Sequence, residues 1–197
     1  MDSASGGVTI TGRAGVSQVS LQRSLAYRGA APSGVTYHVD NGELVLNGCG
    51  QDCSVDYTLT VPANLPVSGS IHSGAITLSG MGSVDVSTDS GQVSMDTIAG
   101  PVKVETASGK IQGQGIKGDH IQAKTSNGGI DLTLATAQDV RAETHNGAID
   151  LAVPASSYHV TAETHSGDKN VDVPNTPTGQ YHLDLRTSNG HIAVKSA

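Results

Sequence analysis

The chain has 197 residues, 25 of them glycine, with no phenylalanine or tryptophan and only 3% aromatic residues. A core without large aromatic side chains must bury many small β-branched ones, which stacked β-coils do because each coil covers the next. The formal charge of -7 and the pI near 5.5 exclude the basic stripe that nucleic-acid-binding proteins present to phosphates, and they disfavour an anionic membrane surface. No apolar run approaches the length of a membrane span. We therefore expect no nucleic-acid partner and no membrane span.

Residues 8–62 predict an N-terminal antiparallel β cap. Strands are predicted over Val8–Thr11, Val16–Tyr27, Val35–Val39 and Glu43–Leu46. Asp40-Asn41-Gly42, between the last two strands, is a hairpin signal because Asn and Gly accept the positive φ that a tight hairpin turn requires. We expect this segment to cover the first coil of a stack and to hide its open sheet edge.

Both cysteines fall in one glycine-bearing loop, Cys49-Gly50-Gln51-Asp52-Cys53. Two thiols alone do not make a structural zinc site, and the loop has one residue more than the thioredoxin-type redox motif. A local disulfide is the favoured interpretation and implies an oxidising compartment, whereas two free or buried thiols are the alternative. The chain opens without a hydrophobic targeting segment, which fits a cytoplasmic protein or a mature ectodomain that lacks its signal or anchor. The disulfide favours the extracellular or cell-surface location.

A short motif recurs through residues 63–197: Thr-x-(Ser/Asn)-Gly, followed two residues after the glycine by Ile or Val. The anchoring glycines are Gly74, Gly91, Gly109, Gly128, Gly147, Gly167 and Gly190, at intervals of 17, 18, 19, 19, 20 and 23 residues. This period is typical of stacked β-coils. Apolar residues on both sides of the glycine alternate as in strands with one buried face, and the phase changes at the glycine, so the chain turns there. The sequence predicts an all-β, elongated stack of short β-coils, a β-solenoid or β-roll, with residues 63–197 as one continuous domain.

Two polar columns accompany the anchoring glycine. Threonine stands three positions before it in six repeats of seven, and Ser or Asn stands one position before it in every repeat. Because both positions share the phase of the buried residues, we expect both columns to face inward and to hydrogen-bond the backbone at the corner. A surface-exposed threonine array of the ice-binding kind is the alternative, and the phase argues against it.

One outward column carries charge. Its members are Glu105, Lys124, Glu143, Glu163 and Arg186. Glu105 with Lys124, and Glu163 with Arg186, are expected to pair across neighbouring coils as exposed ion pairs of at most about 1 kcal/mol each.

Histidines fall mainly on outward positions. Eight residues before the anchoring glycine the column contains His120, Asp139, His159 and His182, and two residues before it His145 and His165 are expected to be neighbours. Imidazole and carboxylate groups on adjacent strands can chelate a transition metal. The sequence therefore offers His120, Asp139, His159, His145 and His165 as candidate metal ligands, with a solvated polar surface as the alternative. No other cofactor is expected.

The order of the motifs carries a family resemblance. A strand ending in Val-Pro, Thr58-Leu59-Thr60-Val61-Pro62, precedes Ser73-Gly74-Ala75-Ile76, Ser90-Gly91-Gln92-Val93 and Ser108-Gly109-Lys110-Ile111. The series covers nearly the whole chain and resembles the adhesin-type, toast-rack β-strand-repeat domains of bacterial envelope proteins (domain of unknown function 4097). The resemblance implies a surface-exposed or anchored module with no established enzymatic activity and no catalytic motif.

The first functional hypothesis is a non-enzymatic surface module: a monomeric adhesin or binding scaffold that meets an envelope glycan or protein. A carbohydrate-active β-helix enzyme of the pectate-lyase type is one alternative, but it needs acidic and basic residues on one broad face, and these coils are short for a wide cleft. A self-assembling cytoskeletal β-solenoid is the other. The non-repetitive residues 8–62 argue against free stacking at the N-terminal end. The sequence singles out no catalytic residue.

Overall fold

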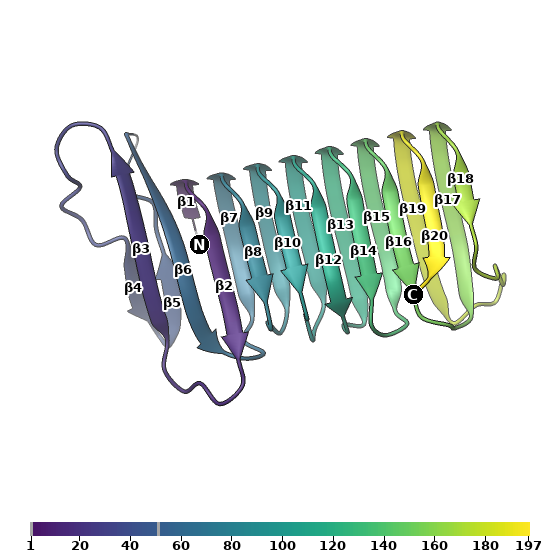
Figure 1. Cartoon of the computed structure of the whole chain (residues 1–197), viewed down its shortest axis with the longest axis horizontal. Helices are drawn as coiled ribbons and strands as arrows, with labels where there is room; N and C mark the ends of the chain where they lie inside the picture. The colour runs from purple at the N-terminus through teal and green to yellow at the C-terminus, as the bar shows by residue number, and fades with distance from the viewer. Residues whose placement is uncertain (1, 51) are drawn as a thin grey trace.

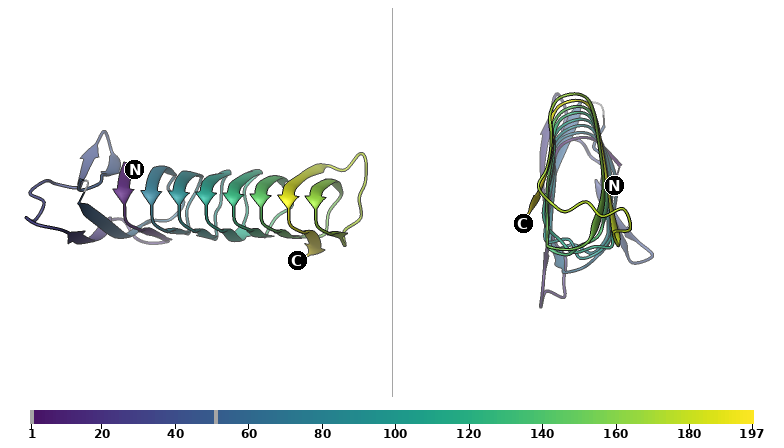
Figure 2. Two further views of the ribbon diagram at one scale, coloured as in Figure 1. Left: turned by 90° about the horizontal axis from the view of Figure 1, so that it is seen from above. Right: turned by 90° about the vertical axis from the view of Figure 1, so that its right-hand side faces the viewer.

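The computed structural model describes residues 2–50 and 52–197, and within them the chain forms an elongated all-β rod (Figure 1). Two sheets face each other along the rod, and the chain passes from one sheet to the other at each corner of a flattened coil (Figure 2). The described residues contain no helix, and so none that is long and apolar enough to cross a membrane. The predicted all-β solenoid, with antiparallel strands at its N-terminus, is confirmed.

Sheet A has eight strands, and each neighbouring pair is parallel. In spatial order they are β1 (Asp2–Ser5), β7 (Val67–Ser73), β9 (Val84–Ser90), β11 (Val102–Ser108), β13 (His120–Asn127), β15 (Asp139–Asn146), β19 (Tyr181–Asn189) and β17 (Tyr158–Ser166).

Sheet B has ten strands. In spatial order they are β18 (Lys169–Val171), β20 (Ile192–Ser196), β16 (Ile149–Val153), β14 (Ile130–Leu134), β12 (Ile111–Ile116), β10 (Val93–Asp96), β8 (Ile76–Ser79), β2 (Val8–Arg13), β6 (Cys53–Pro62) and β3 (Ser20–Tyr27). Only β3 runs antiparallel to its neighbour. Strands β4 (Tyr37–Asp40) and β5 (Glu43–Leu46) form a separate two-stranded sheet.

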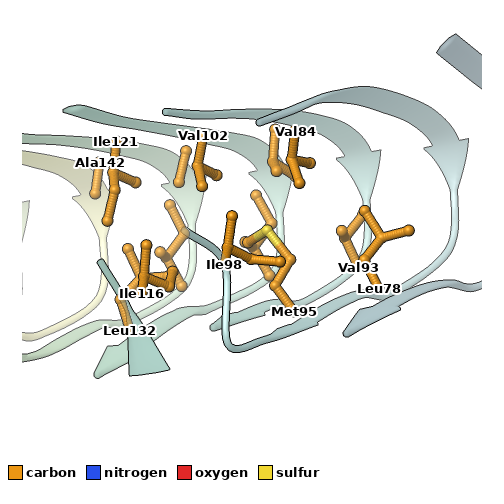
Figure 3. Packing of buried hydrophobic residues seen from close by; sticks show 14 of the residues in the cluster. Leu78, Val84, Val93, Met95, Ile98, Val102, Ile116, Ile121, Leu132 and Ala142 are labelled. Atoms are coloured by element: carbon orange, nitrogen blue, oxygen red, sulfur yellow. The ribbon is translucent and has the colours of Figure 1, made fainter. Parts of the chain in front are cut away.

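The core lies between the two sheets and consists of columns of equivalent side chains (Figure 3). Parallel, in-register pairing stacks Ile111 on Ile130 and Ile130 on Ile149, so that each side chain covers its counterpart in the next coil. All three are at most 1% exposed. Burial of each contributes about 1.5 to 3 kcal/mol, which is how a core without Phe or Trp is built.

The anchoring glycines form a continuous column at one corner. A methyl group added at Gly147 would lie 2.0 Å from the carbonyl oxygen of Gly128, and the same contact recurs from coil to coil. Glycine is therefore required at this corner for two reasons: neighbouring coils approach too closely for a Cβ atom, and several of these positions have positive φ. A methyl group at Gly74 would likewise meet the carbonyl oxygen of Gly6 at 2.2 Å, which places Gly6 in the same column.

The threonine column faces inward, as predicted. Thr144 is 7% exposed, and its hydroxyl donates to the carbonyl oxygen of Gly128 in the preceding coil at 2.9 Å. Thr187 makes the same bond to Gly147 at 2.9 Å. The hydroxyl thus satisfies a corner carbonyl that has no strand partner, at a net gain of about 1 kcal/mol per bond.

The Ser/Asn column does not face inward, and that prediction is wrong. Asn127, Asn146 and Asn189 are exposed, and they form an amide ladder with Nδ2-to-Oδ1 distances of 2.9 Å. The strand pairing skips the residue two positions before the glycine, so the regular alternation breaks one step earlier than the sequence suggested.

The N-terminal region differs from the prediction in one strand. The hairpin β4–β5 is present, with positive φ at Asn41 and Gly42, and β3 pairs antiparallel with β6. Strand β2, however, pairs in parallel with both β6 and β8, and so it belongs to the stack. The segment Ser3-Ala4-Ser5-Gly6-Gly7-Val8 resembles the repeat motif but has Ser where six of the seven other repeats have Thr, and a long insertion separates it from the next repeat.

One buried tyrosine ties the hairpin segment to the stack. Tyr57 is 1% exposed, and its hydroxyl lies within hydrogen-bonding distance of the carbonyl oxygens of Thr36 and Asn47, which flank β4 and β5. Burial raises the pKa of Tyr57, which keeps the phenol protonated as a donor.

The order of coils at the C-terminal end differs from their order in sequence. Strands β19 and β20 lie between the β15/β16 coil and the β17/β18 coil, although β17 and β18 come first along the chain (Figure 1). The connection through Pro174–Gly179 crosses the end of the rod to make this return, which explains the longest motif interval of 23 residues. Asn175 in this connection bonds both the N–H and the C=O of Val160 at 3.0 Å and so covers part of the outermost strand.

Lys169 replaces the buried Ile of the repeat motif in this outermost coil, and it is exposed. A charged side chain on an edge strand, at a position that is buried in the other coils, opposes the addition of a further strand. We expect Lys169→Ile to promote end-to-end association, because burial of one Ile side chain stabilises an interface by about 2 kcal/mol, or roughly thirtyfold in the association constant. Light scattering across a concentration series measures this. Lys103→Ile, on the outer face of a central strand, is the control, and equal association of the two variants would contradict the edge role of Lys169.

Candidate interaction surfaces

The outer face of sheet A carries the predicted charge column. Spatial neighbours in this column are Glu105, Lys124, Glu143, Arg186 and Glu163, in that order. Acid and base therefore alternate along the sheet, although they do not alternate along the sequence. Direct contact between β15 and β17 would have placed Glu143 beside Glu163, and the insertion of β19 puts a guanidinium between the two carboxylates.

Arg186 is the best-connected member of the column. Its Nη1 lies 3.3 Å from Glu163 Oε2, as the sequence predicted for that pair, and its Nε lies 2.9 Å from Asp184 Oδ1. The hydrogen bond to Asp184 is the main reason that the pKa of Arg186 is raised. Glu105 and Lys124 are direct neighbours in register. Within this column, each charged side chain therefore has a side chain of opposite charge as its neighbour on the next strand.

The candidate metal ligands lie in two rows on the same face. His120 is the register partner of Asp139, whose Oδ1 accepts a hydrogen bond from the backbone N–H of His182 at 2.8 Å. The rings of His182 and His159 are 5.4 Å apart in an edge-on arrangement. Spatial order in this row is therefore His120, Asp139, His182, His159, with His182 between Asp139 and His159.

His145 and His165 are not neighbours, contrary to the prediction. Ser188 of β19 lies between them in register, and its hydroxyl oxygen is 3.0 Å from His145 Nδ1. Among residues 2–50 and 52–197 no group of three or more His, Cys, Asp or Glu side chains is arranged to hold a metal ion. Metal binding stays a prediction for His120, Asp139 and His159, which zinc titration of the wild type and of a His120→Ala, His159→Ala variant tests.

The outer face of sheet B differs in chemistry. Two adjacent rows of side chains cross strands β6, β2, β8, β10 and β12. The first row is Thr58, Thr9, Thr77, Ser94 and Gln112, and the second is Thr60, Thr11, Ser79, Asp96 and Gln114. We call these ten residues the hydroxyl–amide strip.

Only one residue of the hydroxyl–amide strip, Asp96, carries a charge. Ser94 and Gln112 are linked through the side chain of Gln92, whose Nε2 lies 2.8 Å from Ser94 Oγ and 2.7 Å from Gln112 Oε1. Partly or fully exposed hydroxyls complete the strip on the neighbouring strands: Thr9, Thr11, Thr58, Thr60 and Thr77. These hydroxyls, spaced about 4.8 Å apart from strand to strand, can donate to or accept from a ligand.

This strip was not predicted from the sequence, although a signal for it was present. Thr58-Leu59-Thr60, Thr9-Ile10-Thr11 and Thr77-Leu78-Ser79 each place a hydroxyl on both sides of a buried apolar residue. The three segments are far apart in sequence, and only the parallel pairing of β2 with both β6 and β8 brings them together.

The two cysteines form a disulfide that joins the loop before β6 to the first residue of that strand. The Cα atoms of Cys49 and Cys53 are 5.5 Å apart, and the described residues contain no free cysteine. The ring closes only a short loop, so we expect its reduction to lower the free energy of unfolding by only about 1 to 2 kcal/mol. Mass measurement after alkylation without reductant checks the bond, and incorporation of two alkyl groups would contradict it.

Residues 66–196 match the family model described as Toastrack DUF4097. No curated protein matches the chain. Among solved structures it is similar to a "putative cell adhesion protein" from Clostridium sporogenes, with 14% sequence identity and a TM-score of 0.43 over 100% of this chain and 90% of that one. A similarity at this level carries no argument about function.

Proposed function

The chain belongs to the Toastrack DUF4097 family, and from that premise we propose that it is a non-enzymatic binding module of the bacterial cell surface that holds an uncharged glycan chain on its hydroxyl–amide strip. The module acts as a rigid monomeric scaffold. Its rod keeps the ligand-facing side chains at fixed spacing, so that little ordering is required when a ligand binds.

The observation that carries the proposal is the contrast between the two outer faces. Sheet A pairs its own charges, as Arg186 with Glu163 and Lys103 with Asp85 at 3.5 Å show. The hydroxyl–amide strip of sheet B consists of hydroxyl and amide groups with Asp96 as its one charge, and Lys110 and Lys195 lie outside the ten residues. A linear glycan presents hydroxyl groups at regular intervals, and Ser, Thr and Gln side chains can both donate to and accept from them.

The charged residues in and beside the strip determine whether a charged or an uncharged glycan can bind there. Beyond β12 the first row continues as Asp131 and Asp150, which are direct register partners. Both have partners, since Lys110 Nζ lies 3.4 Å from Asp131 and His191 Nε2 lies 3.2 Å from Asp150. Asp96, within the second row, accepts a hydrogen bond from the uncharged Ser79 hydroxyl at 3.3 Å, and its charge disfavours an anionic polymer. The strip therefore suits an uncharged polysaccharide, such as the glycan strands of an envelope polymer, better than a polyuronate.

Binding to insoluble chitin and β-glucan, with polygalacturonate as the charged comparison, tests the proposal. We expect the wild type to bind an uncharged polymer and a Thr77→Arg, Ser94→Arg variant to lose at least about tenfold in affinity, since two long cations would cover the strip. Ser87→Arg on sheet A is the matched control and should bind as the wild type does. Binding only to polygalacturonate, or equal binding by the strip variant, would refute this assignment of the surface.

The enzyme alternative makes a different prediction. A pectate-lyase-type enzyme would release sugars from polygalacturonate in a protein-dependent manner, and a single acidic substitution would abolish the release. The proposed module binds without turnover, so the same incubation should yield no soluble sugar. Sustained release would favour the enzyme.

A further inference from the structure

The N-terminal end of the rod contains a cavity because the two sheets end at different places. Sheet A ends at the short strand β1, which pairs with Ser70, Ile71 and Ser73 of β7, whereas sheet B continues through β2, β6 and β3. Strand β1 lies in the same coil as β2, so that β6 and β3 extend beyond the opposite sheet. The β4–β5 hairpin lies beside this end of the rod (Figures 1 and 2).

The space has a volume of about 530 Å³, within the range of small-molecule sites. Its apolar lining comes from three parts of the fold. Sheet B contributes Ile10, Leu59 and Val61, the hairpin contributes Leu44 and Leu46, and the first corner of the stack contributes Leu65, Val67 and Met81. Leu59, Leu46 and Met81 are at most 4% exposed, so they form a buried floor.

Both apolar and polar side chains lie at the mouth of the cavity. Val19 and Leu65 at the mouth are 48% and 40% exposed, which is unusual for side chains beside a buried apolar floor. The turn residues Asn41 and Glu43 lie at the same mouth. Among the described residues that line the cavity, Glu43 is the only ionisable one.

We propose that this cavity binds one single-chain amphiphile with an uncharged, hydroxyl-bearing head group. The alkyl chain lies against Ile10, Leu59 and Met81, and the head group stays at the mouth, where the side chains of Asn41 and Glu43 can hydrogen-bond its hydroxyls. A carboxylate or phosphate head group is disfavoured because Glu43 would repel it and the described lining residues include no cation. The site is separate from the hydroxyl–amide strip, which lies on the opposite side of sheet B from the floor residues.

The hairpin is suited to admit such a ligand. Its base is fixed through Tyr57, whose hydroxyl contacts the carbonyl oxygens of Thr36 and Asn47. Its tip, Asp40–Glu43, is exposed to solvent at all four residues. The tip can therefore move while the base stays in place.

Calorimetric titration of the whole chain with 1-monoacylglycerols, from octanoyl to dodecanoyl and below their critical aggregation concentrations, tests the proposal. We expect saturable one-to-one binding that strengthens about fourfold per added methylene and levels off once the cavity is full. Alkanoates of the same chain lengths should bind at least about tenfold more weakly. A continuous rise without saturation would mean surface adsorption and would overturn the site.

Three variants make the test specific. Glu43→Gln removes the repelling charge at an exposed position and should bring alkanoate affinity to within about threefold of the monoacylglycerol affinity. Asp52→Asn removes an exposed carboxylate of the same region that does not line the cavity, and it should leave the preference unchanged. Leu44→Trp should fill the cavity and abolish binding. If Leu44→Trp does not fold, the Glu43→Gln result decides alone.

Light scattering of the free protein separates a small ligand from a second copy of the chain at this end. A monomer that binds monoacylglycerol supports the proposal. A dimer that the lipid dissociates would show that the apolar end is an interface between copies, which overturns it. Equal effects of Glu43→Gln and Asp52→Asn on alkanoate binding would also overturn it.

Discussion

Replacement of Gly147 by alanine should prevent the rod from folding, or lower its free energy of unfolding by at least about 4 kcal/mol, as the largest core substitutions do. The added methyl group would lie 2.0 Å from the Gly128 carbonyl oxygen, and that carbonyl accepts the Thr144 hydroxyl. Neither partner can move without breaking the ladder that joins adjacent coils. Urea denaturation followed by circular dichroism measures the effect.

Alanine substitutions at two further glycines distinguish the effect of a steric clash from the effect of backbone conformation. Gly147 does not have a left-handed φ, so its substitution tests the contact alone, whereas Gly128 combines φ of +156° with the same contact. Gly34 has open space around it and no left-handed φ. Gly34→Ala should therefore change stability by less than about 0.5 kcal/mol. If the midpoint of urea unfolding of Gly147→Ala equals that of the wild type, neighbouring coils do not approach as closely as described.

Replacement of Ile130 by aspartate should also unfold the rod. Ile130 is 1% exposed and stacks between Ile111 and Ile149, so the carboxylate would have no cation and no water beside it. Loss of the apolar contacts and burial of an unpaired charge together exceed about 5 kcal/mol, comparable with the whole stability of a small domain. The expected product is an expanded chain without the strand signal in circular dichroism.

Thr133→Asp is the matched control for Ile130→Asp. Thr133 lies on the same strand, β14, but on its outer face, where a carboxylate stays hydrated. This variant should fold and melt within a few degrees of the wild type. If both variants melt alike, the assignment of inner and outer faces of sheet B is wrong.

The repeat motif made the coil predictable from sequence because one glycine column and three apolar columns recur at nearly constant spacing. The inward direction of Thr144 and its equivalents followed from the same alternation. The direction of Asn146 did not, because the pairing skips a residue immediately before the corner, and such an irregularity leaves no mark in the apolar pattern. The antiparallel hairpin was predictable because Asn41-Gly42 encodes its turn locally.

The order of coils was not predictable from the motif alone. Every coil presents similar apolar columns to its neighbours, so β15 can pair equally well with β17 or with β19 as far as Ile, Val and Leu are concerned. The distinguishing residues are few: Lys169 marks an outermost coil, and Arg186 fits between Glu143 and Glu163. The hydroxyl–amide strip was missed for a related reason, since it depends on the long-range placement of β2.

The exchanged strand order decides how the rod would bear tension. The last strands along the chain, β19 and β20, are each flanked on both sides, and so is β2 near the other terminus. A pull on the C-terminal end of the chain therefore loads an internal coil first, whereas β1 at the N-terminal end is an edge strand of sheet A that pairs with β7. To yield, that coil must break two hydrogen-bonded ladders at once, whereas an outermost coil would peel away from one. Under a pull on its C-terminal end the rod would therefore lose its shape at higher force than it would with coils stacked in simple sequence order.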